Sequence, residues 1–282
     1  MIDHFEPLVH SGKLLDGLEL GEVLLFRADR GGHRLAWDNL NAETLRLWRE
    51  HFPDDEEEAL APLFYPDHGP VELLFVGFNP SFNIAETQAR APAGLDVNDF
   101  YRWQGFAEDR IPIMQAVQHQ FIQDFAYFTP MQNIAHYAEM TWAHIDLYPL
   151  RNTRQNETIE YFRNRPILKE SLELLFQTTV YAIRPQIIVV ANAYASRCVE
   201  RLFGEDLSFD ETVGFHRLEM DEDEAAVFFS GMLTGQRALD TGSFKRLRWH
   251  VRRAAVTLKS AKTAMDRRGH MSWGPGDIEI HD

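Results

Sequence analysis

The short apolar run at residues 73–76 constrains the fold more than any other stretch of this sequence. It follows the turn residue Pro70, it stops at Gly77, and the polar residues Asn79 and Ser81 come directly after it. A continuous apolar run between turn signals is typical of a strand buried on both faces of a parallel sheet. Because ligands bind outside the carboxyl ends of such strands, the residues after this run are candidates for a binding site.

The rest of the chain repeats the alternation of strand and helix signals. Strands are predicted at residues 73–76, 142–149, 184–192, 212–220 and 225–229, and helices at 41–52, 113–125, 130–137, 156–178, 193–203 and from 243 onward. Strands that alternate with helices indicate an α/β domain with helices on both faces of the sheet. We therefore predict a three-layer αβα fold with a mainly parallel central sheet.

The chain is predicted to have one main domain with an extension at each end. Residues 1–69 form a helical N-terminal extension, in which Leu45, Trp48 and Phe52 lie on one helix face and Asn41 is the N-cap. Prolines and a glycine before residue 71 mark the boundary. The α/β domain then spans residues 70–268, and residues 269–282 form an irregular C-terminal tail.

The composition is typical of a folded protein without a membrane span. Of 282 residues, 45% are hydrophobic and 25% are charged, and no apolar run reaches the roughly 20 residues that cross a bilayer. The sequence does not begin like a signal peptide. Cys198 is the only cysteine, which excludes an internal disulfide and a cysteine-based metal or iron–sulfur site. A cytoplasmic location is the default expectation.

The charge is acidic overall but unevenly distributed. The net charge of −15 argues against a nucleic-acid partner. Nevertheless, the segment from Lys245 to Arg268 carries nine basic residues and Asp266 as its only acid. Such a segment serves either a phosphate backbone or a solvated helix face, and the sequence leaves both interpretations open.

Polar residues follow several predicted strands at what would be one rim of the sheet. They are Asn79 after the first strand, Asp146 near the end of the second, Asn192 after the third, and the loop from Ser230 after the last. Each also has an ordinary structural interpretation, since Asn-Pro turns and Asp caps are common. The stripe formed by residues 113, 117, 121 and 125 favours core over a binding pocket.

A metal site is not predicted. His144 and Asp146 have a spacing that suits two ligands, but protein metal sites use three or more and no third ligand has a motif-like position. No other cofactor motif is present either, because the sequence lacks G-x-S-x-G, P-loop and G-x-G-x-x-G patterns.

The order of elements resembles that of the uracil-DNA glycosylase superfamily over about residues 70–256. Three local matches carry the resemblance. Residues 77–80, Gly-Phe-Asn-Pro, are similar to the first motif of the mismatch-specific and single-strand-selective branches. Residues 186–195 are similar to the strand and turn beneath the site, and residues 230–235 with the helix from Ser243 take the place of the second motif.

The resemblance implies a DNA-repair hydrolase that cleaves the N-glycosidic bond of a flipped, uracil-like or deaminated base. It implies that Asn79 holds the attacking water and that Asp146 reads the edge of the base. Phe78 or Phe82 would stack on the base, and Met232 would fill the gap left in the duplex. The other implied substrate contacts are Gly77, Pro80, Ser81, Asn192, Ser230, Gly231 and Leu233, and the implied phosphate contacts are Ser243, Lys245, Arg246 and Arg248.

Two alternatives stay open at this point. The family's second motif supplies His-Pro-Ser or Asn-Pro-Ser, whereas this chain has Ser230, Gly231 and Met232. An ionised Asp146 would only accept hydrogen bonds, whereas the asparagine usual at this position donates and accepts. These differences favour a nucleic-acid- or nucleotide-binding module of the same fold that does not cleave. A hydrolase of a small nucleotide-like metabolite would explain the acidity, because no duplex need approach it.

Overall fold

The computed structural model of the chain describes residues 32–52, 59–221, 223–235 and 237–269. The first part of the predicted N-terminal extension, residues 1–31, lies outside the described residues, and so does the predicted tail beyond Gly269. Among the described residues, no helix is long and apolar enough to cross a membrane.

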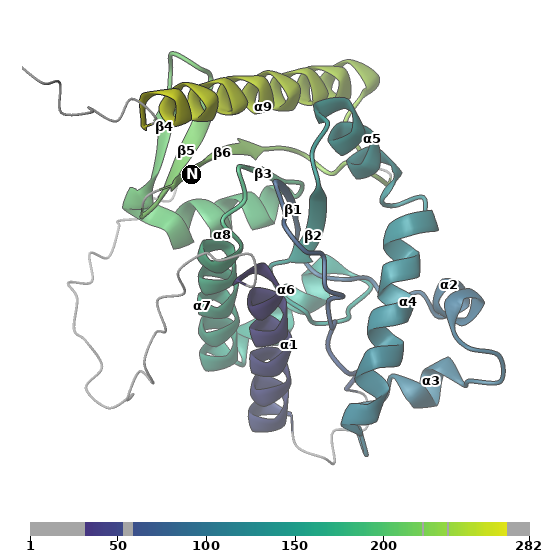
Figure 1. Cartoon of the computed structure of the whole chain (residues 1–282). Helices are drawn as coiled ribbons and strands as arrows, with labels where there is room; N and C mark the ends of the chain where they lie inside the picture. The colour runs from purple at the N-terminus through teal and green to yellow at the C-terminus, as the bar shows by residue number, and fades with distance from the viewer. Residues whose placement is uncertain (1–31, 53–58, 222, 236, 270–282) are drawn as a thin grey trace, which may run out of the picture.

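A six-stranded mixed sheet forms the centre of the protein (Figure 1). Its strand order is β2-β1-β3-β6-β5-β4, and the first four of these strands are parallel. The last two pair antiparallel at one edge. The α/β prediction is therefore confirmed. The strands are β1 Leu73–Gly77, β2 Trp142–Asp146, β3 Ile187–Val190, β4 Leu207–Asp210, β5 Phe215–Met220 and β6 Asp223–Phe229.

Helices cover both faces of this sheet. Successive residues of a strand point to opposite faces, so alternate residues of one strand contact the helices on either side. In β1, Leu74 and Val76 join one hydrophobic cluster with α1, α6, α7 and α8, while Leu73 and Phe75 join a second cluster with α5 and α9. The helices are α1 Gly32–His51, α2 Ile84–Arg90, α3 Val97–Phe100, α4 Ile111–Asp124, α5 Thr129–Ala138, α6 Gln155–Arg163, α7 Pro166–Ile183, α8 Ala193–Phe203 and α9 Thr241–Gly269. Short 3₁₀ turns lie at Glu108–Arg110 and Gly204–Asp206.

Helix α1 packs along α7 and contributes to the same hydrophobic cluster as one face of the sheet (Figure 1). Leu45, Trp48 and Phe52 are buried, as their spacing predicts. The prediction for Asn41 is wrong, because α1 begins nine residues earlier, at Gly32. Asn41 instead lies inside the helix with its amide against the backbone of Tyr65: Nδ2 donates to the Tyr65 carbonyl and Oδ1 accepts from the Tyr65 N–H, both at 2.8 Å.

Replacing Asn41 with alanine should therefore destabilise the protein by ~1–3 kcal/mol, because the buried Tyr65 N–H loses its acceptor. Gln115 also donates to the Tyr65 carbonyl, so that oxygen keeps one partner. Urea unfolding measures the change. The matched control is Asn39→Ala on the exposed face of the same helix, which should change the free energy of unfolding by less than about 0.5 kcal/mol.

Two other sequence-based boundaries are wrong. The helix predicted over residues 156–178 is two helices, because the residue before a proline is driven out of the helical region. Arg165, with φ −135° and ψ 61°, separates α6 from α7, which begins at Pro166. Strand β4, Leu207–Asp210, was not predicted. The strand predicted from 212 begins at Phe215, after a turn.

Candidate functional site

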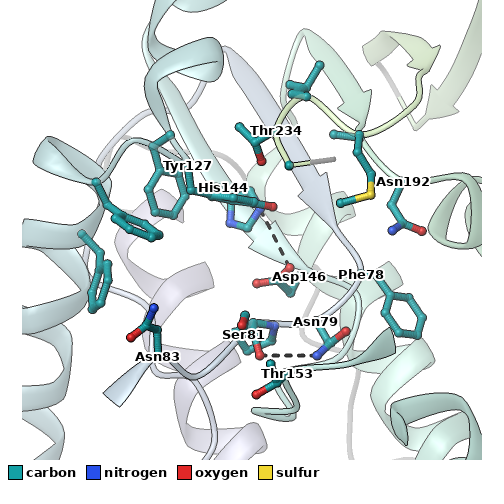
Figure 2. A pocket seen from close by; sticks show the side chains of 18 of the residues that line it. Phe78, Asn79, Ser81, Asn83, Tyr127, His144, Asp146, Thr153, Asn192 and Thr234 are labelled. Carbon is teal, nitrogen blue, oxygen red and sulfur yellow. Dashed lines mark hydrogen bonds and ion pairs between the residues drawn. The ribbon is translucent and has the colours of Figure 1, made fainter. Parts of the chain in front are cut away.

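A cavity of about 720 Å³ opens at the carboxyl ends of the parallel strands (Figure 2). The loops after β1, β2, β3 and β6 all reach this edge of the sheet, and Gly77 of β1 lies in register with Asp146 of β2. Eight of the predicted catalytic and substrate-binding residues line the cavity, namely Phe78, Asn79, Pro80, Ser81, Asp146, Asn192, Met232 and Leu233. Gly77, Phe82, Ser230 and Gly231 are not among the lining residues.

The amide of Asn79 is held in one orientation by the loop that follows β2. Its Nδ2 donates to the Asn152 carbonyl at 2.7 Å and approaches the carbonyls of Leu150 and Pro80 at 3.4 Å. Because all three partners are acceptors, the nitrogen must face them. No described residue donates to Oδ1, so this oxygen is the part of Asn79 that can accept a hydrogen bond from a water or a ligand (Figure 2).

Gly77 lies behind the cavity and lets the Asp146 carboxyl cross over the end of β1. A Cβ at this position would collide with Asp146 Oδ1 and would lie 2.9 Å from His144 Nε2. The glycine is thus required by close packing at the site rather than by direct contact with a ligand.

We expect Gly77→Ala to destabilise the protein by ~1–3 kcal/mol, which is the usual cost of overpacking. Thermal or urea unfolding measures it. Adding Asp146→Ala removes the colliding oxygen. The double variant should therefore lose less free energy of unfolding than the two single variants lose in sum. Purely additive effects would show that the collision does not determine the residue at this position.

Asp146 is a buried carboxyl group at the floor of the cavity. Its backbone N–H donates to the Tyr65 hydroxyl at 2.9 Å, and its Oδ1 lies 3.9 Å from Nε2 of His144. Burial raises the pKa of Asp146 to about 8, although the positive charge of Arg151 acts in the opposite direction. At neutral pH the group is mainly protonated, and a carboxylic acid both donates and accepts. The contrast drawn from the sequence was between an ionised Asp146, which only accepts hydrogen bonds, and an asparagine, which donates and accepts. A protonated Asp146 does not differ from asparagine in this respect.

His144 lies beside Asp146 on the same strand and is almost fully buried. Burial lowers its pKa to about 3, so the ring is neutral at pH 7. Neither ring nitrogen has a hydrogen-bond partner among the described residues, and the ring lies nearly perpendicular to those of Tyr127 and Phe128. The described part of the chain holds no cluster of three or more His, Cys, Asp or Glu residues that suits a metal ion.

One wall of the cavity is aromatic and was not predicted as part of the site. It is formed by Phe121 of α4, by Phe125 directly after the end of this helix, and by Tyr127 and Phe128 in the turn that follows. Sequence periodicity assigned Phe121 and Phe125 to the core, but both are only half-buried and face the cavity. Such a wall suits the face of a planar ring.

Phe78 and Phe82 have other neighbours than the implied base. The Phe78 ring packs edge-on against Tyr148 and Tyr194, at 5.4 and 5.0 Å between centroids. Phe82 packs against Tyr101, at 5.2 Å between centroids. Both rings therefore already pack against aromatic side chains of the protein.

Asn192 is the N-cap of α8, although it also borders the cavity. Its Oδ1 accepts from the backbone N–H groups of Tyr194 and Ala195, and its Nδ2 donates to Gln155 at 3.0 Å. The side chain therefore begins α8 and connects it to the first residue of α6, and a ligand would meet atoms that already have partners.

Arg151 is a cavity residue for which the sequence carried no signal. Its guanidinium lies over the rings of Tyr101 and Phe82, at 4.9 and 5.7 Å from their centroids. Its Nε is buried without a hydrogen-bond partner, and no ion pair joins it to a described carboxylate. Burial lowers the pKa of the guanidinium below its ordinary value, but an arginine keeps its charge at neutral pH.

The predicted phosphate contacts lie on the first turns of α9, outside the cavity lining. Asp240 caps the start of α9, because it accepts from the backbone N–H groups of Gly242 and Ser243 and also from the Ser243 hydroxyl. Lys245 and Arg246 are exposed, and Arg246 donates to Ser243 Oγ at 3.0 Å. The guanidinium of Arg248 stacks on the ring of Tyr137, 4.5 Å from its centroid.

Comparison of the sequence with protein-family models and with curated proteins finds no match.

Proposed function

We propose that this protein is an N-glycosidic hydrolase that holds a nucleobase in the cavity and cleaves the bond between the base and its sugar. The observation that carries the proposal is the meeting of Asn79 and Asp146 at the ends of two adjacent parallel strands, where both line one cavity. A volume of about 720 Å³ is within the range of small-molecule sites and has room for a base and a sugar.

The order of elements supports the resemblance to the uracil-DNA glycosylase superfamily. Strand β1 leads into the Gly-Phe-Asn-Pro loop, helices follow, and β2 brings Asp146 to the same edge. Strand β3 then leads into α8, and β6 leads through the 230–235 loop into α9. The antiparallel pair β4 and β5 is an addition at the far edge of the sheet, away from the first two strands.

Recognition of the base is assigned to Asp146 and the aromatic wall. A protonated Asp146 offers one donor and one acceptor, which complements the adjacent C=O and N–H groups of uracil, hypoxanthine or xanthine. A face of the base would lie against Phe125 or Tyr127. A wrong base would leave this buried donor or acceptor unpaired. Unpaired buried polar groups are the usual cause of strong discrimination between substrates.

The water is assigned to Asn79. Its Oδ1 accepts a hydrogen bond from a water molecule and directs the water oxygen at C1′ of the sugar. In the reaction a bond forms between this oxygen and C1′, while the C1′–N bond breaks and its electron pair leaves with the base. The sugar carries positive charge in the transition state, the base carries negative charge, and one water proton passes to solvent.

DNA is the proposed partner. A base inside a duplex is out of reach, so the target nucleotide would be extruded into the cavity. The 230–235 loop, with Met232 at the cavity, would occupy the space that it leaves. Lys245 and Arg246, both exposed at the start of α9, would contact phosphates.

A free nucleoside or nucleotide is the second candidate substrate. Two observations favour it: the net charge is −15, and Arg248, one of the implied phosphate contacts, is stacked on Tyr137. The chemistry at C1′ would be unchanged.

Presenting the same base in three contexts tests the proposal and separates the two substrates. Uracil is offered in a single-stranded oligonucleotide, in a duplex and as the free nucleoside, and free base is quantified by chromatography. Release from an oligonucleotide that falls steeply with added salt supports DNA as substrate. Release only from the nucleoside supports the second candidate. Absence of release from all bases tried in all three contexts contradicts the hydrolase.

A further inference from the structure

The cavity contains a cation without a counterion. Arg151 lines it, and neither an ion pair nor a hydrogen bond connects the guanidinium to another described residue. Arg151 is half-buried, with its Nε enclosed. An uncompensated charge in such a position is costly, and proteins keep such groups mainly where a ligand or a reaction uses them.

No other charge among the described lining residues balances Arg151. The lining residues hold three further titratable groups: Tyr127, His144 and Asp146. Burial raises the pKa of Tyr127 far above neutral pH, lowers that of His144 to about 3 and raises that of Asp146 to about 8. All three are therefore mainly uncharged at neutral pH. Within a chain of net charge −15, the described lining of this cavity is positive.

The position of Arg151 is fixed by its neighbours on both sides. Tyr101 and Phe82 lie under the guanidinium plane. The backbone carbonyls of Leu150 and Asn152, the residues before and after Arg151, lie at 3.4 and 2.7 Å from the Asn79 amide nitrogen. Asn79, which is assigned to the water, therefore contacts the same loop that carries Arg151. A charged group that is already held in place needs little reorganisation when an opposite charge develops beside it.

We propose that Arg151 is the anion-binding residue of this cavity, and that it pairs with the negative charge that develops on the base as the C1′–N bond breaks. The assignment to the reaction rests on the proposed function, in which the electron pair of that bond leaves with the base. Arg151 keeps its own proton and stabilises the anion by charge and hydrogen bonding. The ligand class is a planar heterocycle with an acidic N–H next to a carbonyl.

Equilibrium binding tests the anion site without requiring catalysis. The probes are uracil, which is neutral at pH 7, and 5-nitrouracil, which is ionised, and the affinities are measured by titration calorimetry. We expect the wild type to bind the ionised base at least about tenfold more tightly, a difference of ~1.4 kcal/mol. Arg151→Gln should reduce this preference to less than about twofold, while Arg151→Lys should keep part of it.

The matched control is Arg154→Gln, three residues further along, where the arginine is exposed and pairs with Glu157 at 3.7 Å. It should keep the wild-type preference. A wild type that does not prefer the ionised base, or an Arg151→Gln variant that still does, overturns the inference.

The dependence on the leaving group tests the role in catalysis. 5-Fluorouracil is the more acidic base and leaves more easily than uracil. Arg151→Gln should therefore slow the release of uracil by a larger factor than the release of 5-fluorouracil. An equal loss for both bases would show a merely structural role and would overturn the catalytic assignment. If the wild type prefers the ionised base but releases none, the proposed function fails while the anion site is supported.

Discussion

Replacing Asn79 with alanine should lower the rate of base release by about 100-fold or more, because the variant cannot direct the attacking water. The position of this residue is fixed from both sides: Gly77 and Pro80 shape its loop, and the Asn152 carbonyl accepts from its amide at 2.7 Å. The rate is measured under single turnover with saturating protein, so that a change in substrate affinity does not enter.

The fold should survive this substitution. The side chain is only half-buried, so the loss of its hydrogen bond costs about 1 kcal/mol. Asn98→Ala is the matched control, since Asn98 undergoes the same chemical change, is exposed, lies outside the cavity lining and makes no side-chain hydrogen bond to a described residue. It should leave the rate within about threefold of wild type. An Asn79→Ala variant that is folded and releases base at the wild-type rate would contradict the role of Asn79.

Asp146→Asn should stabilise the protein, and the gain should grow with pH. Burial raises the pKa of Asp146 from 3.8 to about 8 in the folded state. Between these values the folded state binds more protons than the unfolded state, so stability falls as pH rises. One proton changes the free energy of unfolding by at most ~1.4 kcal/mol per pH unit. Asparagine does not titrate, so the variant lacks this loss.

The difference in free energy of unfolding between Asp146→Asn and wild type separates the contribution of Asp146 from that of the histidines. Burial lowers the pKa of His144 to about 3 and that of His68 to about 4. The free energy of unfolding therefore gains from both histidines as pH rises to about 6.5. Below that pH this gain partly hides the loss that Asp146 causes. Urea unfolding at several pH values between 5 and 9 gives the difference. It should increase up to about pH 8 and then stay constant. A difference that decreases with pH would show that Asp146 is ionised in the folded protein.

The same substitution should leave base binding largely intact at pH 7, because a protonated Asp146 and an asparagine both present one donor and one acceptor side. Wild-type binding of uracil should weaken above about pH 8 as Asp146 ionises, and the Asn variant should not show this decline. Asp146→Leu, which has a similar shape but no polar atom, should lose binding at every pH.

The sheet and the edge at which the site lies were predictable from the sequence. Strands buried on both faces, such as 73–77 and 187–190, appear as unbroken apolar runs. Parallel strands bring their carboxyl ends to one edge, so Asn79 and Asp146 were expected on the same rim. Both line the cavity in the structure.

Much of the cavity was not predictable, because its residues carry no local signal. An apolar helix stripe is the same whether it faces the core or a cavity, so Phe121 and Phe125 were assigned to the core. Arg151 is a single loop residue, and only the fold places it over Tyr101 and beside the site. The protonation of Asp146 depends on burial, which no spacing pattern encodes.

The most direct test of the account is the release of free base by the wild-type protein. Single- and double-stranded oligonucleotides carrying uracil, hypoxanthine, xanthine or a G·T mismatch, together with the matching free nucleosides, are incubated with the protein at low salt, and free base is quantified over time. We expect first-order release of at least one of these bases by the wild type and its loss in Asn79→Ala. No release from any substrate by folded wild-type protein would contradict it.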